Sequence, residues 1–241
     1  MELGDSIMNY KPSWNWLDVI LVYGGIIILS FLMGRYGQHL MSFLHQFGFP
    51  NVGLAYFTVA YVLQFLVTVG LVLLLVVVAR RTDWRELGLK PLSARKMLRY
   101  GIVGGLALLA VIFVLSLPLE ILNPDIEPQV YEEILRSAHG VSQLLLLLLM
   151  GAVLAPISEE LFFRGMIYPL TRYSLGPFWG AIGAGIIFGL AHWDAWRAIP
   201  LAIGGAILCY LYEKSGSIWA TVTAHGMWNG IMTLLVYFSL A

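Results

Sequence analysis

Long apolar runs recur along this chain and leave few residues to connect them. A helix needs about 20 mainly apolar residues to cross a bilayer, and a backbone in lipid must satisfy its own hydrogen bonds. The runs therefore predict an all-α fold, a polytopic integral membrane helical bundle with about seven to eight transmembrane helices. The predicted spans cover residues 17–33, 54–79, 101–117, 141–160, 178–192, 199–212 and 218–240.

The composition agrees with this fold and limits the kinds of molecule that the protein can bind. Apolar residues make up 59% of the chain and charged residues 12%, whereas soluble domains carry roughly a quarter charged residues. The 14 basic and 14 acidic residues leave no net charge. Nucleic acid is therefore excluded as a partner, and the lipid bilayer is the expected surrounding. The lone cysteine, Cys209, excludes an intrachain disulfide and a cysteine-based metal site.

The loops between the spans predict the orientation and the division of the chain. Half of the basic residues lie within residues 80–99, whereas residues 120–136 hold five acidic residues and one basic residue. The positive-inside rule places residues 80–99 and the N-terminus on the cytoplasmic side of a plasma-membrane protein. We expect residues 1–86 to form N-terminal transmembrane helices with a basic cytoplasmic loop. Residues 87–241 are expected to form one continuous membrane bundle.

Some helix boundaries carry specific expectations. Residues 35–49 are either an extension of the first span or a separate interfacial helix, because apolar residues recur there at helical spacing. Pro118 is expected to end the third span and Pro156 to kink the fourth. A turn near Leu175 is expected to separate the fourth and fifth spans, which makes them an antiparallel hairpin.

A charged cluster stands at the end of the fourth apolar run. Glu159, Glu160 and Arg164 follow that run directly, and charged groups at membrane depth are costly, which marks them as a candidate site. Residues four apart share a helix face, so Glu160 is predicted to pair with Arg164. Glu159 is turned about 100 degrees away and has no cation on its own face. It is therefore the carboxylate available for proton transfer.

Two histidines inside apolar segments supply further polar groups. His192 follows Phe188 by four residues, and Asn229 follows His225 by four, so each pair shares a helix face. Glu159 and His192 stand at nearly equal distances from the expected hairpin turn, which predicts equal depth. His225 follows the turn at Gly216 by nine residues, so it is expected to lie roughly 10 Å lower than Glu159 and His192.

The order of these residues resembles a known family. Glu-Glu-x-x-x-Arg, Phe-x-x-x-His and His-x-x-x-Asn on successive membrane helices are similar to the three motifs of the CAAX-protease and bacteriocin-processing (CPBP, or Abi) family, which includes type II CAAX prenyl endopeptidases. The resemblance covers residues 87–230. It implies that residues 87–241 form a catalytic membrane domain, and that the protein is an intramembrane endopeptidase acting on a membrane-anchored peptide or protein substrate.

The resemblance also implies roles for the motif residues. Glu159 would be the base that activates a water, with His192 helping to hold that water. Glu160 and Arg164 would order the site.

The third motif and two phenylalanines are expected to face the substrate. By resemblance, His225 and Asn229 would donate hydrogen bonds to the oxyanion of the tetrahedral intermediate. Such preorganised donors act strongly in a cavity of low dielectric. Phe163 and Phe188, which lie within two of the motifs, are predicted to line the substrate pocket.

The favoured mechanism requires no cofactor, because a glutamate base and a water can act without a metal. A carboxylate with two histidines is also an acceptable zinc set, and Glu159, His192 and His225 would then be the ligands. Two other functions stay open: a non-enzymatic membrane immunity or regulatory partner, and a proton-coupled transporter. The substrate could be prenylated or of the peptide-pheromone or bacteriocin type.

Overall fold

Helices form every regular element in the computed structural model, which describes residues 11–123 and 127–239 except for the side chains of residues 119 and 120. No strand occurs in these ranges, and the predicted all-α fold is confirmed. In chain order the elements are α1 (Trp16–Gln46), α2 (Val52–Val72), η2 (Leu73–Ala79), η3 (Trp84–Leu87), α3 (Ala94–Lys96), η4 (Met97–Val103), α4 (Gly104–Leu122), α5 (Val130–Arg136), α6 (Gly140–Leu148), η5 (Leu149–Leu154), α7 (Ala155–Glu160), η6 (Leu161–Ile167), α8 (Tyr168–Leu190), α9 (Ala198–Ser215) and α10 (Ile218–Ser239).

Several helical segments are long and apolar enough to cross a membrane, as a multi-pass membrane protein requires. They are Trp16–Gln46, Val52–Ala79, Ala94–Pro118 and Gly140–Leu190. The last segment contains a break at Gly176, where φ is 77° and the helix turns back. The predicted turn near Leu175 is therefore confirmed. The total of about seven to eight spans stays a prediction, because α9 and α10 are not among these four segments.

The structure settles the end of the first span and shows how the third helix ends. α1 runs without interruption to Gln46, so residues 35–46 extend the first span. The third membrane-spanning segment ends at Pro118, as expected, whereas the helix α4 itself continues to Leu122. A membrane helix tolerates a proline where neighbouring groups or local backbone adjustments satisfy the backbone group that the proline leaves free. The connection before residue 140 holds the short helix α5. The predicted cytoplasmic N-terminus and the predicted end of the last span at Leu240 lie outside the described residues.

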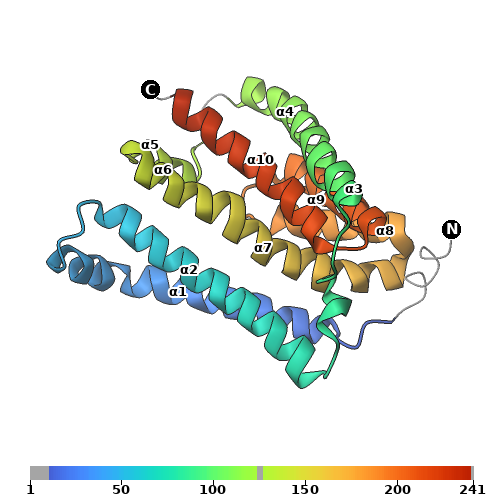
Figure 1. Cartoon of the computed structure of the whole chain (residues 1–241). Coiled ribbons are helices and arrows are strands. Elements are labelled where there is room, and N and C mark those ends of the chain that lie inside the picture. Colours follow the sequence, from blue (N-terminus) through green and yellow to red (C-terminus); the bar gives the residue numbers. More distant parts are fainter. Residues whose placement is uncertain (1–10, 124–126, 240–241) are drawn as a thin grey trace.

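The helices form layers of roughly aligned rods (Figure 1). α1 and α2 lie side by side along one flank and α4 lies along the opposite flank, with α6–α7 and α10 between them. The N-terminal helices are tied to the remainder near one end of the bundle. There the indole of Trp14 donates to the carbonyl of Met166 at 2.8 Å. At the same end, an ion pair of Arg80 with Asp18 at 2.9 Å joins the end of η2 to the start of α1. Residues 11–86 and the later helices thus pack as one body.

α8 and α9 approach each other closely because glycines remove side chains from their interface. A Cβ added at Gly185 would collide with the carbonyl oxygen of Ala202 on α9, and one added at Gly189 would collide with the carbonyl oxygen of Ala198. Small residues permit this kind of contact between membrane helices. The approach matters for function because α8 leads directly into His192.

We expect Gly185→Ala to lower the free energy of unfolding by about 1 to 3 kcal/mol, because the added methyl group must force α8 and α9 apart. Gly183→Ala is the matched control on the same helix, since its Cβ would meet Leu175 Cδ1 at an ordinary 3.8 Å. Thermal unfolding in detergent measures both variants. Equal stability of the two would contradict a close α8–α9 contact at Gly185.

Candidate active site

The three motifs meet through a buried network around Glu160. Arg164 Nη1 donates to Glu160 Oε1 at 2.8 Å, which confirms the predicted pair. His225 Nδ1 lies 2.8 Å from the same oxygen, and because a carboxylate can only accept, the Nδ1–H is the donor. Arg164 Nη2 also donates to the carbonyl of Gly205 on α9 at 2.9 Å. Glu160 and Arg164 are both fully buried, so this network is screened from solvent.

The contact with Glu160 shows that the expected height of His225 was wrong. Glu213, just before the turn at Gly216, accepts a hydrogen bond from Tyr168 Oη at 2.9 Å. This turn therefore stands at the level of Tyr168, eight residues beyond Glu160. His225 lies nine residues beyond Gly216 on the returning helix. The separations of eight and nine residues nearly match, so the side chains of Glu160 and His225 meet at one level.

The backbone around the two glutamates is locally irregular. The helix α7 carries both glutamates and is flanked by the π-helical segments η5 and η6. π-Helical turns within α-helices frequently occur at functional sites. α10 reaches η5 closely at Gly226, where an added Cβ would collide with the carbonyl oxygen of Ala152. The glycine next to His225 thus lets α10 approach the helix that bears the glutamates.

Glu159 points to a different environment from Glu160. It lines a polar cavity of about 170 Å³ together with His192. The predicted equal depth of these two residues is consistent with their shared cavity. Within the described part of the chain, Glu159 Oε2 has no hydrogen-bond partner, and it lies 3.9 Å from Nε2 of His225. Two adjacent glutamates therefore have separate surroundings.

His192 presents one ring nitrogen to this cavity. Its Nδ1 lies 2.8 Å from the carbonyl oxygen of Phe188, which can only accept, so Nδ1 carries a proton. In a neutral imidazole Nε2 is then unprotonated and can accept a hydrogen bond. The Phe188 ring packs edge-on against His192, with centroids 4.7 Å apart. The second motif thus supplies an oriented imidazole.

The remaining predicted site residues take distinct positions. Asn229 Nδ2 donates to the carbonyl of Gly151 at 2.9 Å, which commits one of its two amide hydrogens to η5. Its predicted oxyanion role stays a prediction. Phe163 lines the polar cavity, as predicted for a pocket residue. Phe188 is fully buried under the Arg164 guanidinium and lines neither this cavity nor the apolar one described below.

Sequence reasoning missed the wall of the cavity that α2 provides. Tyr61, Gln64, Phe65 and Thr68 line the cavity opposite Glu159. The signal was available, because Gln64 and Thr68 are polar residues four apart inside a long apolar span, and such residues share a helix face. The candidate site therefore extends beyond the three motifs.

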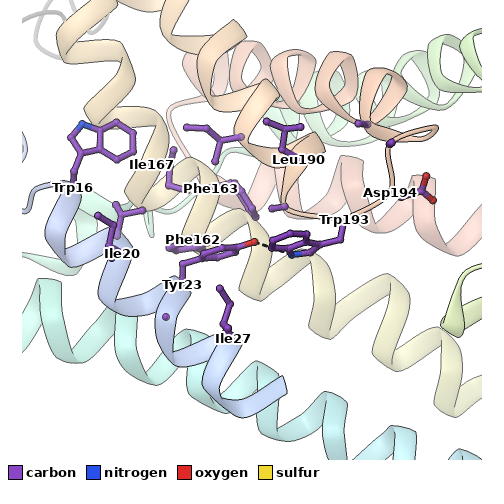
Figure 2. A pocket seen from close by; sticks show the side chains of 16 residues that line it. Trp16, Ile20, Tyr23, Ile27, Phe162, Phe163, Ile167, Leu190, Trp193 and Asp194 are labelled. Carbon is purple, nitrogen blue, oxygen red and sulfur yellow. Dashed lines mark hydrogen bonds between the residues drawn. The ribbon is translucent and has the colours of Figure 1, made fainter. Parts of the chain in front are cut away.

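A larger apolar cavity of about 810 Å³ adjoins the polar one. Its wall includes Trp16, Ile20 and Tyr23 of α1, and Trp193 and Asp194 from the connection after α8 (Figure 2). The two cavities share a set of lining residues: Tyr23, Phe162, Phe163 and Ala191. The polar centre thus borders a space suited to an apolar ligand.

Asp194 is the charged residue at the edge of that apolar space. Burial acts to raise its pKa, but hydrogen bonds from the backbone and side chain of Arg197 outweigh burial and hold the pKa below its ordinary value. Asp194 also forms an ion pair with Arg197. The Asp194 carboxylate is therefore already bound by Arg197, a residue of the same connection.

The side chains of the zinc set that the sequence permits, Glu159, His192 and His225, are not arranged as metal ligands. No group of three histidine, cysteine, aspartate or glutamate side chains in residues 11–123 and 127–239 is arranged to hold a metal ion. Glu159, His192 and His225 do not form such a group, and His225 Nδ1 is engaged by Glu160. No step of the mechanism below therefore passes through a metal.

The fold and the site define a multi-pass membrane protein with a buried glutamate–arginine–histidine centre. Residues 141–231 match the family model described as type II CAAX prenyl endopeptidase Rce1-like, and all motif residues fall within this segment. The family resemblance of the three motifs is thereby confirmed over the segment. A protein of Bacillus subtilis (strain 168) named "Putative membrane peptidase YdiL" is 26% identical over 90 residues, which are 37% of this chain and 37% of that protein. No solved structure matches the chain.

Arg164→Ala should lower the free energy of unfolding by about 3 to 5 kcal/mol, because it leaves the buried Glu160 carboxylate uncompensated. The matched control is Arg136→Ala, which breaks another pair four residues apart, Arg136–Glu132, whose side chains are 50% and 28% exposed. That change should cost about 0 to 1 kcal/mol. Chemical unfolding in detergent compares the two, and similar losses would show that the Glu160–Arg164 pair is not critical for stability.

Proposed function

We propose that this protein is an intramembrane endopeptidase in which Glu159 is the base that activates a water. One observation carries the proposal: Glu159 lines a polar cavity with His192, while the adjacent Glu160 is locked by Arg164 and His225. A cavity of about 170 Å³ has room for water beside the carboxylate. The match of residues 141–231 to a prenyl endopeptidase family and the name of the Bacillus subtilis relative support a peptidase.

The proposed reaction is a base-assisted hydrolysis. A water bound between Glu159 and His192 Nε2 gives a proton to Glu159, and its oxygen attacks the carbonyl carbon of the substrate peptide bond. The carbonyl electron pair moves to the oxygen, which becomes the oxyanion of a tetrahedral intermediate. As the carbon–nitrogen bond breaks, Glu159 returns the proton to the leaving amine. The base is thereby regenerated.

His225 has a proposed part in stabilising the oxyanion. Its Nδ1–H is held by Glu160, which leaves Nε2 near Glu159 as the nitrogen that can meet substrate. When protonated, Nε2 donates a hydrogen bond to the developing negative charge, as a donor to an oxyanion must. The second hydrogen of the Asn229 amide is the proposed further donor.

The proposed substrate is membrane-anchored. The apolar cavity beside the catalytic centre is lined by aromatic and aliphatic side chains and suits a lipid-like or apolar peptide segment. A bond close to such a segment would lie next to Glu159. We further propose a plasma-membrane location with a cytoplasmic N-terminus, on the basis of the positive-inside pattern.

Glu159→Gln should reduce peptide cleavage by about two to four orders of magnitude, the usual contribution of a general base. Purified protein is assayed against a library of membrane peptides, prenylated and unmodified. Glu133→Gln is the control, because Glu133 is an exposed carboxylate on α5. Undiminished cleavage by Glu159→Gln would refute the base assignment.

The same preparation tests the alternatives. A strong chelator should leave cleavage unchanged under the proposed metal-free mechanism, and loss restored by zinc would contradict it. Peptide binding without cleavage by the unaltered protein would favour an immunity or regulatory partner. Proton flux into vesicles that depends on Glu159 would favour a transporter.

A further inference from the structure

His192 stands outside the helix that carries the rest of its motif. α8 ends at Leu190, and His192 is the second residue of the connection to α9. Its backbone N–H donates to the carbonyl of Gly189 at 3.3 Å, which ties the start of the connection to the last turn of α8. The bond from Nδ1 to the Phe188 carbonyl orients the ring, but the position of the ring depends on how the connection is held.

The next residue, Trp193, adopts a backbone conformation that bulky residues rarely take. Its φ is 55°, in the left-handed region. After three other helices glycine takes this region, with φ of 76° or 77° at Gly48, Gly88 and Gly216, and Arg81, with φ of 54°, is the other non-glycine residue in it among the described residues. Glycine takes this conformation without steric cost. A tryptophan at such a position persists only where surrounding contacts hold it, and strain of this kind clusters at functional sites.

The contact that holds Trp193 comes from α1. Its indole Nε1 donates to Tyr23 Oη at 3.1 Å (Figure 2). Trp193 is 82% exposed, so burial does not fix the ring. Tyr23 lines both the apolar cavity and the polar cavity with Glu159. This single bond therefore joins α1, which lies outside the matched residues 141–231, to the neighbour of His192.

The far side of the connection is fixed separately. Asp194 Oδ1 accepts hydrogen bonds from the backbone N–H groups of Trp196 at 3.1 Å and Arg197 at 3.0 Å. The guanidinium of Arg197 reaches the carbonyl of Glu127 at 3.1 Å. The connection is thus anchored at α8 and at Asp194, and Trp193 links its middle to α1.

We propose that Tyr23 and Trp193 form a clasp that positions His192 beside Glu159, so that α1 completes the catalytic site. The inference rests on the proposed function. Both clasp residues are positioning residues, since they act through His192. Because both line the apolar cavity, an apolar substrate segment bound there contacts the clasp while its peptide bond lies at the polar centre.

Two variants separate positioning from folding. Tyr23→Phe removes the hydroxyl and keeps the ring, and Trp193→Gly removes the indole and suits the left-handed backbone. Each should lower kcat about three- to ten-fold, the effect of one lost hydrogen bond. KM should change less than about two-fold in Tyr23→Phe, whose ring keeps the apolar wall, whereas Trp193→Gly also removes part of that wall and should raise KM. Trp193→Gly should unfold at the same or a higher temperature than the unaltered protein.

The matched control is Tyr56→Phe. This change removes a hydroxyl that links α2 to α1, where Tyr56 Oη donates to the carbonyl of Met33 at 2.9 Å, and Tyr56 lines neither cavity. A double variant of Tyr23 and Trp193 should lose no more kcat than Trp193→Gly alone, because both changes remove one interaction. Values of kcat equal to those of Tyr56→Phe, or losses that follow a lower unfolding temperature, would overturn the clasp.

A spectroscopic measurement makes the clasp testable even if no peptide is cleaved. In protein labelled with ¹³C-histidine, the signal of His192 is the one missing from His192→Gln. This signal should shift or broaden in Tyr23→Phe and stay in place in Tyr56→Phe. An unchanged signal in Tyr23→Phe would overturn the clasp, whereas absent cleavage by the unaltered protein with a shifted signal would refute only the proposed function.

Discussion

The buried contact of Glu160 with Arg164 and His225 is the interaction on which the rest of the site depends. Charges with no solvent exposure must satisfy one another, since an unpaired charge in an apolar interior is very costly. Arg164 meets this requirement by bonding Glu160 and the carbonyl of Gly205 at once. The network therefore fixes η6, α9 and α10 relative to one another and sets the framework that leaves Glu159 at the cavity.

Adjacent glutamates acquire different surroundings because a helix rotates neighbouring side chains to different faces. Glu160 turns inward to the network, whereas Glu159 turns to the polar cavity. The irregular turns η5 and η6 on either side adjust the backbone where α10 comes close at Gly226. A structural carboxylate and a proposed catalytic one can thus occupy consecutive positions, with Nδ1 of His225 bound to Glu160 and Nε2 of the same ring 3.9 Å from Glu159.

Much of this arrangement followed from local patterns in the sequence. Apolar runs predicted the helices, and the four-residue spacing predicted the Glu160–Arg164 pair. The height of His225 was mispredicted because the hairpin turns were assumed to stand at one level. Glu213 in fact places the Gly216 turn against Tyr168. No local pattern could supply that offset, because it depends on a contact between residues 45 positions apart.

The sequence by itself determined that the chain forms apolar membrane helices and which polar residues interrupt them, because periodicity and composition act over a few turns of one helix. Only the tertiary structure decided that α1 and α2 wall the polar cavity, through residues such as Tyr23 and Gln64. It also decided that His225 reaches Glu160. The physical reason is that contacts between helices depend on close backbone approach at glycines and on the levels of distant turns, which side-chain spacing within one helix does not encode.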